Sequence, residues 1–277
     1  MSTLKTAIER LSSLGEVESN PEARKTFIDF RDQLTQGKIR AAEKVDGKWT
    51  VNVWVKQGIL LGFRLGELSQ MGDGPTLSFV DKDTFPARRF AVADRVRIVP
   101  GGSSIRLGSF VAPGVICMPP MFINVGAYVD EGTMVDSHAL VGSCAQIGKR
   151  VHLSAAAQVG GVLEPVNAAP VIVEDDVLIG GNCGVYEGTV VRARAVLGAG
   201  TILTRSTPLY DLVRREVYKA TGDSPLEVPE NAVVVPGSRA VKKGAPSGWN
   251  LSLYTPVIVK YRDEKTDQRI ELEDWLR

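Results

Sequence analysis

A branched aliphatic residue recurs at every sixth position through the middle of this chain. In the stretch VDEGTMVDSHALVGSCAQIG the recurring residues are Val129, Val135, Val141 and Ile147. A period of six matches neither the 3.6 residues of a helical turn nor the two-residue alternation of an ordinary strand. The residues between are mostly small or polar, so the segment calls for a fold with a hexapeptide unit.

The same spacing continues on both sides of this stretch, in two registers. The first comprises Ile105, Val111, Cys117, Ile123, Val129, Val135, Val141, Ile147, Leu153 and Val159, and the second comprises Val173, Ile179, Val185, Val191, Leu197 and Leu203. The registers are separated by one hexad plus eight extra residues, which include Pro165 and Pro170. Because proline interrupts regular pairing, we predict an extruded loop near 163–172.

A hexapeptide period is typical of a β-helix, in which each hexad forms one flat side and three sides close a coil. The aliphatic residue points inward, and small residues are favoured at the corners, where we place Gly108, Gly114, Gly126, Gly132 and Gly198. Coils stack at about 4.8 Å, so residues 18 apart lie one above another. We therefore predict a mainly β fold built on a parallel β-helix.

The β-helix is expected to fill residues 96–236, with other structure at both ends. Residues 1–95 predict a mainly helical domain, with a helix start at Asn20-Pro21. Residues 237–277 predict a short C-terminal extension that contains the strand-like SLYTPVIVK. Because a solenoid leaves its ends open, these flanking regions are expected to cover them.

Composition excludes several classes of function. The 277 residues carry a net charge of +1, which predicts neither a nucleic-acid nor an anionic-membrane partner. No apolar run approaches the roughly 20 residues that span a bilayer, and no secretory signal is recognisable. Three scattered cysteines and two histidines predict neither a disulfide framework nor a zinc site, so a cytoplasmic location is expected.

The stretch MPPMFINVGAYVDEGTMVDSHALVGSCAQIGKRVHLSAAAQVGGVLEP resembles the core of the tetrahydrodipicolinate N-succinyltransferase family. AEKVDGKWTVNVWVKQGILLGFR and SLYTPVIVK are similar to its N-terminal and last segments. The resemblance implies a left-handed coil and a homotrimer with active sites between neighbouring prisms. It also implies succinyl-CoA as co-substrate, no permanently bound cofactor, and a small dicarboxylate amine, 2-amino-6-oxopimelate, as acceptor in lysine and diaminopimelate biosynthesis.

This reaction needs a proton acceptor for the amine and cationic partners for carboxylates. Asp136, one position after inward Val135, should face outward, and the resemblance implies that it orients the amine and acts as the catalytic base. A corner aspartate that only bonds nearby backbone is the alternative. Arg97 matches the family's substrate-binding arginine, and Arg106 is a weaker candidate for the same role.

The acyl donor is expected to approach two further segments. Gly160-Gly161 would let the pantetheine arm lie against backbone, and one of these amides is a candidate oxyanion donor; Gly161 is our candidate cofactor-binding residue. Lys242 and Lys243 are candidates for contact with CoA phosphates. A tight turn and a solvated basic pair are the plainer interpretations of these two features.

Two positions depart from the family pattern. Where well-known members read SEVVEG, with a glutamate proposed to help deprotonate the amine, this chain has Gly184. His138 stands where a tryptophan is often found, and is interpreted as a surface residue or a proton shuttle. Cys144 and Cys183 are interpreted as structural.

Two alternatives differ in donor or in class. The same acceptor with acetyl-CoA is one, although the similarity of residues 41–64 argues against it because acetylating enzymes have a different N-terminal region. A non-catalytic trimeric β-helix scaffold is the other, and predicts no affinity for CoA.

Overall fold

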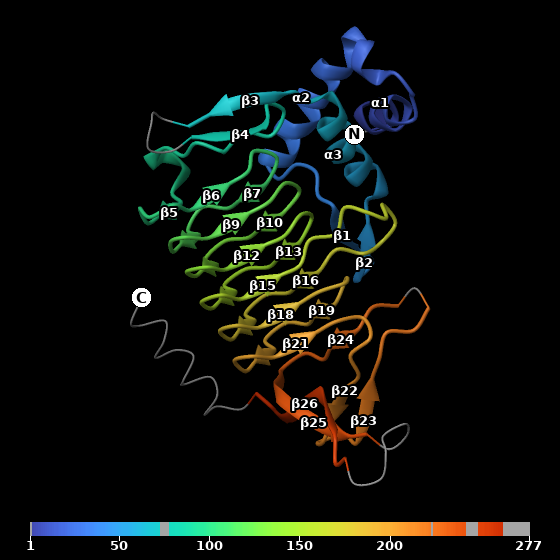
Figure 1. The fold of residues 1–277 in the computed structure, drawn as a ribbon, viewed down its shortest axis with the longest axis vertical. Coiled ribbons are helices and arrows are strands. Elements are labelled where there is room, and N and C mark those ends of the chain that lie inside the picture. Colours follow the sequence, from blue (N-terminus) through green and yellow to red (C-terminus); the bar gives the residue numbers. More distant parts are fainter. Residues whose placement is uncertain (1, 73–77, 223, 242–248, 263–277) are drawn as a thin grey trace.

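A computed structural model describes residues 2–72, 78–222, 224–241 and 249–262 of this protein. Figure 1 shows a helical domain at one end of the molecule, a stack of short strands in the middle and a β-ribbon at the other end. Within the described residues no helix is long and apolar enough to cross a membrane.

The middle of the chain winds into a three-sided parallel β-helix, as the hexapeptide period predicted. Each side is one sheet of mostly two-residue strands, which we name after its first strand. The β7 sheet contains β7 (Phe110–Val111), β10 (Tyr128–Val129), β13 (Gln146–Ile147), β16 (Ile172–Val173), β19 (Val190–Val191) and β24 (Glu227–Val228). The β6 sheet contains β6 (Ser104–Ile105), β9 (Phe122–Ile123), β12 (Leu140–Val141), β15 (Gln158–Val159), β18 (Gly184–Val185) and β21 (Ile202–Leu203).

The β5 sheet has ten strands because a ribbon extends it beyond the last coil. Its coil strands are β5 (Arg97–Ile98), β8 (Ile116–Cys117), β11 (Met134–Val135), β14 (His152–Leu153), β17 (Leu178–Ile179) and β20 (Val196–Leu197). It continues into β25 (Ala232–Ala240), β26 (Ser252–Tyr261), β22 (Leu209–Asp211) and β23 (Glu216–Tyr218). The strand predicted from SLYTPVIVK is therefore β26, paired with both β25 and β22.

The inward aliphatic residues form one continuous core. Val135 pairs with Cys117 in one neighbouring coil and with Leu153 in the other, and all three are fully buried. The last coil continues the period without an obvious signal, since Val228 and Val234 are again six apart and buried. Burial of this column of side chains is the main force that holds the coils in register.

The corners need left-handed backbone, and glycine is only one way to supply it. Gly126 and Gly132 have φ of 75° and 71°, but the equivalent residues of later corners include Cys144 and Ala156, with φ of 66° and 58°. The expectation for Gly198 was wrong: Gly200, three residues after inward Leu197, takes the left-handed conformation with φ of 76°. Favourable coil stacking therefore tolerates a strained corner at non-glycine residues.

The N-terminal domain combines helices with two hairpins that the sequence analysis did not separate. Its helices are α1 (Ser2–Ser12), η1 (Val17–Ser19), α2 (Pro21–Thr35), α3 (Val53–Leu65) and η2 (Val92–Asp94), and its hairpins are β1 (Ala42–Val45) with β2 (Lys48–Val51) and β3 (Leu68–Met71) with β4 (Phe79–Lys82). Helix α2 begins where predicted, with the Asn20 side chain accepting from the Glu22 amide. The core of the N-terminal domain includes Phe27, Phe30 and Ile59 together with Val125 and Cys144 of the β-helix, so the domain is packed onto the prism.

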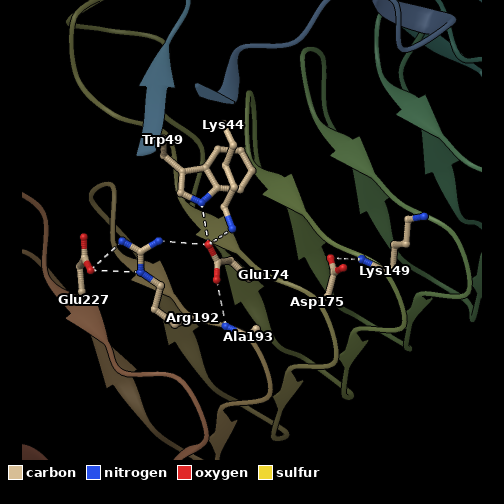
Figure 2. Close-up of polar contacts among 8 residues, drawn as sticks. All are labelled: Lys44, Trp49, Lys149, Glu174, Asp175, Arg192, Ala193 and Glu227. Carbon is tan, nitrogen blue, oxygen red and sulfur yellow. Dashed lines mark hydrogen bonds and ion pairs between the residues drawn. The ribbon is translucent and has the colours of Figure 1, made fainter. Parts of the chain in front are cut away.

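The β1–β2 hairpin is fastened to the prism through one buried carboxylate. Glu174, 8% exposed, accepts hydrogen bonds from Trp49 Nε1 at 2.9 Å and pairs with Lys44 Nζ at 2.8 Å, both from the hairpin (Figure 2). From the prism it contacts Arg192 Nη1 at 3.1 Å and the Ala193 amide at 3.0 Å. Burial alone would raise the pKa of Glu174, but these hydrogen bonds and charges outweigh it, so the pKa lies below its usual value.

Candidate active site

Asp136 lies at the corner where the β5 sheet turns into the β6 sheet. It follows inward Val135 of β11, and its side chain is 28% exposed. Its amide donates to the Leu153 carbonyl at 2.9 Å, and its Oδ1 accepts from the Ser137 amide at 2.7 Å. The backbone therefore fixes one carboxylate oxygen and leaves the carboxylate with further acceptor sites.

The other oxygen of Asp136 faces a histidine from the next coil. His152 Nε2 lies 3.8 Å from Asp136 Oδ2, and the histidine side chain is 15% exposed. His152 is the outward residue of β14, and its Cα partner in β11 is Met134. The sequence analysis assigned it no role at the site, although a separation of 18 residues between positions 134 and 152 is the coil period that could have found it.

Arg97 lies on the same sheet as β11, the strand that precedes Asp136, and is exposed. It is the first residue of β5, pairs with Ile116 of β8, and Ile116 pairs with Met134 of β11. Two strand spacings place the backbone of Arg97 about 10 Å from that of Met134. A molecule with carboxylates at both ends of a seven-carbon chain is of similar length.

Arg106 is already engaged within the fold. Its side chain is 17% exposed, pairs with Asp81 of β4 and bonds Asn124 Oδ1 at 3.3 Å. The guanidinium also lies over the Phe63 ring, 5.3 Å from the centroid. These contacts tie the β3–β4 hairpin to the first coils, and they fit the plainer interpretation of Arg106.

Gly160 and Gly161 lead from β15 into the extruded segment. Gly161 is exposed. A Cβ on Gly142 would lie 2.6 Å from the Cα of Gly161, so the backbones at Gly142 and Gly161 approach more closely than a side chain would allow. The Val162 amide then donates to the Ser143 carbonyl at 3.1 Å. Farther along, the buried ammonium of Lys56 on α3 donates to the Ala168 carbonyl, which anchors the segment to the helical domain.

Two family models and several known proteins match this chain. Residues 2–65 match the model of the tetrahydrodipicolinate N-succinyltransferase N-terminal region, and residues 170–205 match the hexapeptide repeat of succinyl-transferase. A 2,3,4,5-tetrahydropyridine-2,6-dicarboxylate N-succinyltransferase from Paramagnetospirillum magneticum is 42% identical over 273 residues, 96% of this chain and 92% of that protein. One from Burkholderia ambifaria is 42% identical over 277 residues, 98% of this chain and 96% of that protein.

This chain belongs to the tetrahydropyridine-2,6-dicarboxylate N-succinyltransferase family. The resemblance noted in the sequence is confirmed, and the three-sided solenoid is the left-handed β-helix that it implied.

Gly184, where the resemblance led us to expect a glutamate, lies beside the ring of Tyr186. A Cβ on Gly184 would lie 2.9 Å from both Cζ and Oη of Tyr186, and a Cβ on Gly160 would lie 2.8 Å from Tyr186 Cδ1. The phenol ring therefore lies close to two glycines of successive coils, in space that a side chain at position 184 would need.

The remaining expected site residues fall in different surroundings. His138 is exposed at its corner, with φ of 61°. Cys144 and Cys183 are buried, and burial raises the pKa of both thiols, to about 12 for Cys144, which fits their structural interpretation. Lys242 and Lys243 lie outside the described residues. Among the residues that are described, no group of three or more His, Cys, Asp and Glu side chains gathers to hold a metal ion.

Proposed function

We propose that this protein transfers the succinyl group of succinyl-CoA to the amine of 2-amino-6-oxopimelate, the open form of tetrahydrodipicolinate, in lysine and diaminopimelate biosynthesis. The observation that carries the proposal is the 42% identity to N-succinyltransferases over nearly the whole of both chains. The likeness covers the helical domain as well as the repeats, and hexapeptide repeats alone would support many acyl acceptors.

Asp136 is proposed as the catalytic base and the group that orients the acceptor amine. Its carboxylate is exposed enough to reach substrate, is fixed at Oδ1 by the Ser137 amide and projects from a rigid corner. The free amine attacks the thioester carbonyl, the C–S bond breaks, and no covalent enzyme intermediate is needed because a thioester is already activated.

Arg97 is proposed as the partner of a substrate carboxylate. Its guanidinium presents a planar fork suited to a carboxylate, and its position on the sheet of Asp136 matches the length of the acceptor. Charge-assisted hydrogen bonds of this kind contribute about 1.5–3 kcal/mol each.

The acyl donor is proposed to lie against Gly161, with Lys242 meeting its phosphates. Support for Gly161 comes from its exposure and from the side-chain-free approach of two backbones at this point. Succinyl-CoA acts as a co-substrate that leaves as CoA, so the proposal includes no permanently bound cofactor.

The assembly is proposed to be a homotrimer with each site between neighbouring prisms. The neighbouring outward positions Phe122 and Leu140 of the β6 sheet are apolar and partly exposed, and such a surface suits packing against a second copy. A cytoplasmic location is part of the same proposal, and the three buried cysteines, all free thiols, are compatible with it.

Steady-state kinetics with two donors test this function. Release of CoA thiol is followed with the acceptor present and either succinyl-CoA or acetyl-CoA, and the product is weighed by mass spectrometry. We expect a kcat/KM for succinyl-CoA at least about 100-fold higher, since the two donors differ by a charged group worth several kcal/mol when bound. Equal or better use of acetyl-CoA would overturn the succinyl assignment, and no turnover with no affinity for CoA would favour the scaffold alternative.

A further inference from the structure

His152 is the one histidine whose imidazole faces the proposed base among the described residues. Its Nε2 is buried below the surface and lies 3.8 Å from Asp136 Oδ2. The outward side chains on either side of it along the sheet are Met134 and Leu178, which carry no charge. On the preceding corner Arg150 is paired with Asp176, at 2.7 Å. Asp136 is a charged group that the fold brings to this ring.

The backbones of the two residues are fixed by hydrogen bonds to neighbouring coils. His152 donates its amide to Val177 at 3.0 Å and Asp136 donates its amide to Leu153 at 2.9 Å, so the backbones of both residues are fixed by strand pairing. A distance of 3.8 Å is just longer than a hydrogen bond, and catalytic contacts often tighten when substrate binds.

From this geometry we infer that His152 positions the Asp136 carboxylate and shares the proton that Asp136 takes from the acceptor amine. The inference rests on the proposed function. In the reaction the amine nitrogen forms a bond to the thioester carbon, and the C–S bond breaks with its electron pair on sulfur. The proton lost by nitrogen passes to the Asp136–His152 pair and is returned to the thiolate, giving neutral CoA thiol.

A carboxylate alone is a weak base for this reaction, and contact with an imidazole compensates for that. An ordinary aspartate has a pKa of about 4 and is a weak acceptor for a proton from an amine near neutral pH, whereas an imidazole titrates at about 6.5. A histidine in contact with the carboxylate can hold the proton at a pH closer to 7. This role requires contact with Asp136, which the structure records for His152 and not for the exposed His138.

Matched glutamine variants of the two histidines test the inference in the full-length protein. We expect His152→Gln to lower kcat by about 10- to 100-fold and to move the acid limb of the kcat–pH profile to lower pH. His138→Gln should leave both unchanged. A purely structural role for His152 would lower activity without moving the acid limb, and either that result or a shift caused by His138→Gln would overturn the inference.

A titration that needs no turnover separates this inference from the proposed function. The chain has two histidines, so the imidazole resonances in NMR are assigned with His138→Gln. Removing the Asp136 charge with Asp136→Asn should lower the pKa of His152 by about one unit and leave that of His138 in place, because a nearby carboxylate favours the imidazolium. An unchanged His152 titration would refute the pair even if the enzyme uses succinyl-CoA; a shifted one together with no succinyl transfer would refute the function alone.

Discussion

The phenol ring of Tyr186 lies where the side chain of residue 184 would begin. A Cβ on Gly184 would come within 2.9 Å of Tyr186 Oη, which is closer than real side-chain contacts allow. The ring of Tyr186 therefore fills the space that is left because Gly184 has no side chain. The glutamate that family resemblance led us to look for would meet this ring, so one of the two side chains would have to move.

Restoring that glutamate is expected to destabilise the protein. Gly184→Glu should lower the free energy of unfolding by about 1–3 kcal/mol, because overpacking forces the ring or the coil to move. Adding Tyr186→Val should recover most of this loss, since it removes the atoms that the new side chain meets. Denaturant midpoints of the two variants and of Tyr186→Val alone measure the coupling, and additive effects would show that the ring is free to move away.

Asp136→Asn tests the proposed base without disturbing its corner. The amide oxygen of asparagine can still accept from the Ser137 amide, so we expect an unchanged thermal midpoint. Loss of the proton acceptor should lower kcat by about 100- to 10,000-fold with little change in KM. A variant that retains full kcat would return Asp136 to the role of a corner residue that only bonds nearby backbone.

The anchor of the extruded segment gives a test of the donor site. Lys56→Met removes the hydrogen bond from the buried ammonium to the Ala168 carbonyl while keeping an apolar stem of similar length. If the segment that begins at Gly161 contacts the donor, the KM for succinyl-CoA should rise by about ten-fold and that for the acceptor should change little. Lys25→Met, at an exposed position of α2, is the matched control and should change neither. A rise confined to the acceptor would place the donor elsewhere.

Glu174 makes the attachment of the helical domain depend on pH. Its pKa is lowered in the folded protein, so its ionised form contributes stability that is fully present above its usual value of 4.5 and is lost as pH falls through the lower folded value. Glu174→Gln should therefore reduce stability by about 1–3 kcal/mol at pH 7, and the difference from wild type should shrink in acid. Thermal midpoints measured across pH for the two proteins follow the change.

Glu131→Gln is the control for that experiment. Glu131 pairs with Lys149 at 3.9 Å on the surface, where its side chain is 70% exposed. Water screens such a pair, so the substitution should leave the midpoint nearly unchanged. Equal effects of the two substitutions would mean that the buried contacts to Lys44 and Trp49 do not hold the hairpin.

The β-helix could be predicted from sequence because its periodicity is local and one-dimensional. Each inward residue, such as Val135, contacts the residues 18 positions away on either side, so the pattern repeats at a fixed interval. The predicted bounds of 96–236 include the last coil, but its inward residues were not identified, because the β22–β23 hairpin interrupts the spacing between Leu203 and Val228. The short hairpins of the N-terminal domain lack a comparable repeat. Strand β2 ends just before helix α3, so the sequence does not mark where the strand ends and the helix begins.

The candidate site was only partly predictable. Outward placement of Asp136 follows from its position after Val135, but its contact with His152 depends on how side chains lean across neighbouring coils. Likewise, the sequence shows that Gly184 lacks the expected glutamate side chain. Only the structure shows that the ring of Tyr186 occupies that space. Arg106 was considered as a substrate-binding residue, but its side chain pairs with Asp81, which belongs to a hairpin whose position the sequence does not specify.

The most direct test of the account is a crystal structure of the protein with CoA and an unreactive analogue of the acceptor. The account predicts that the acceptor nitrogen lies within about 3 Å of an Asp136 carboxylate oxygen, with an acceptor carboxylate on Arg97. An acceptor bound away from both residues would contradict it.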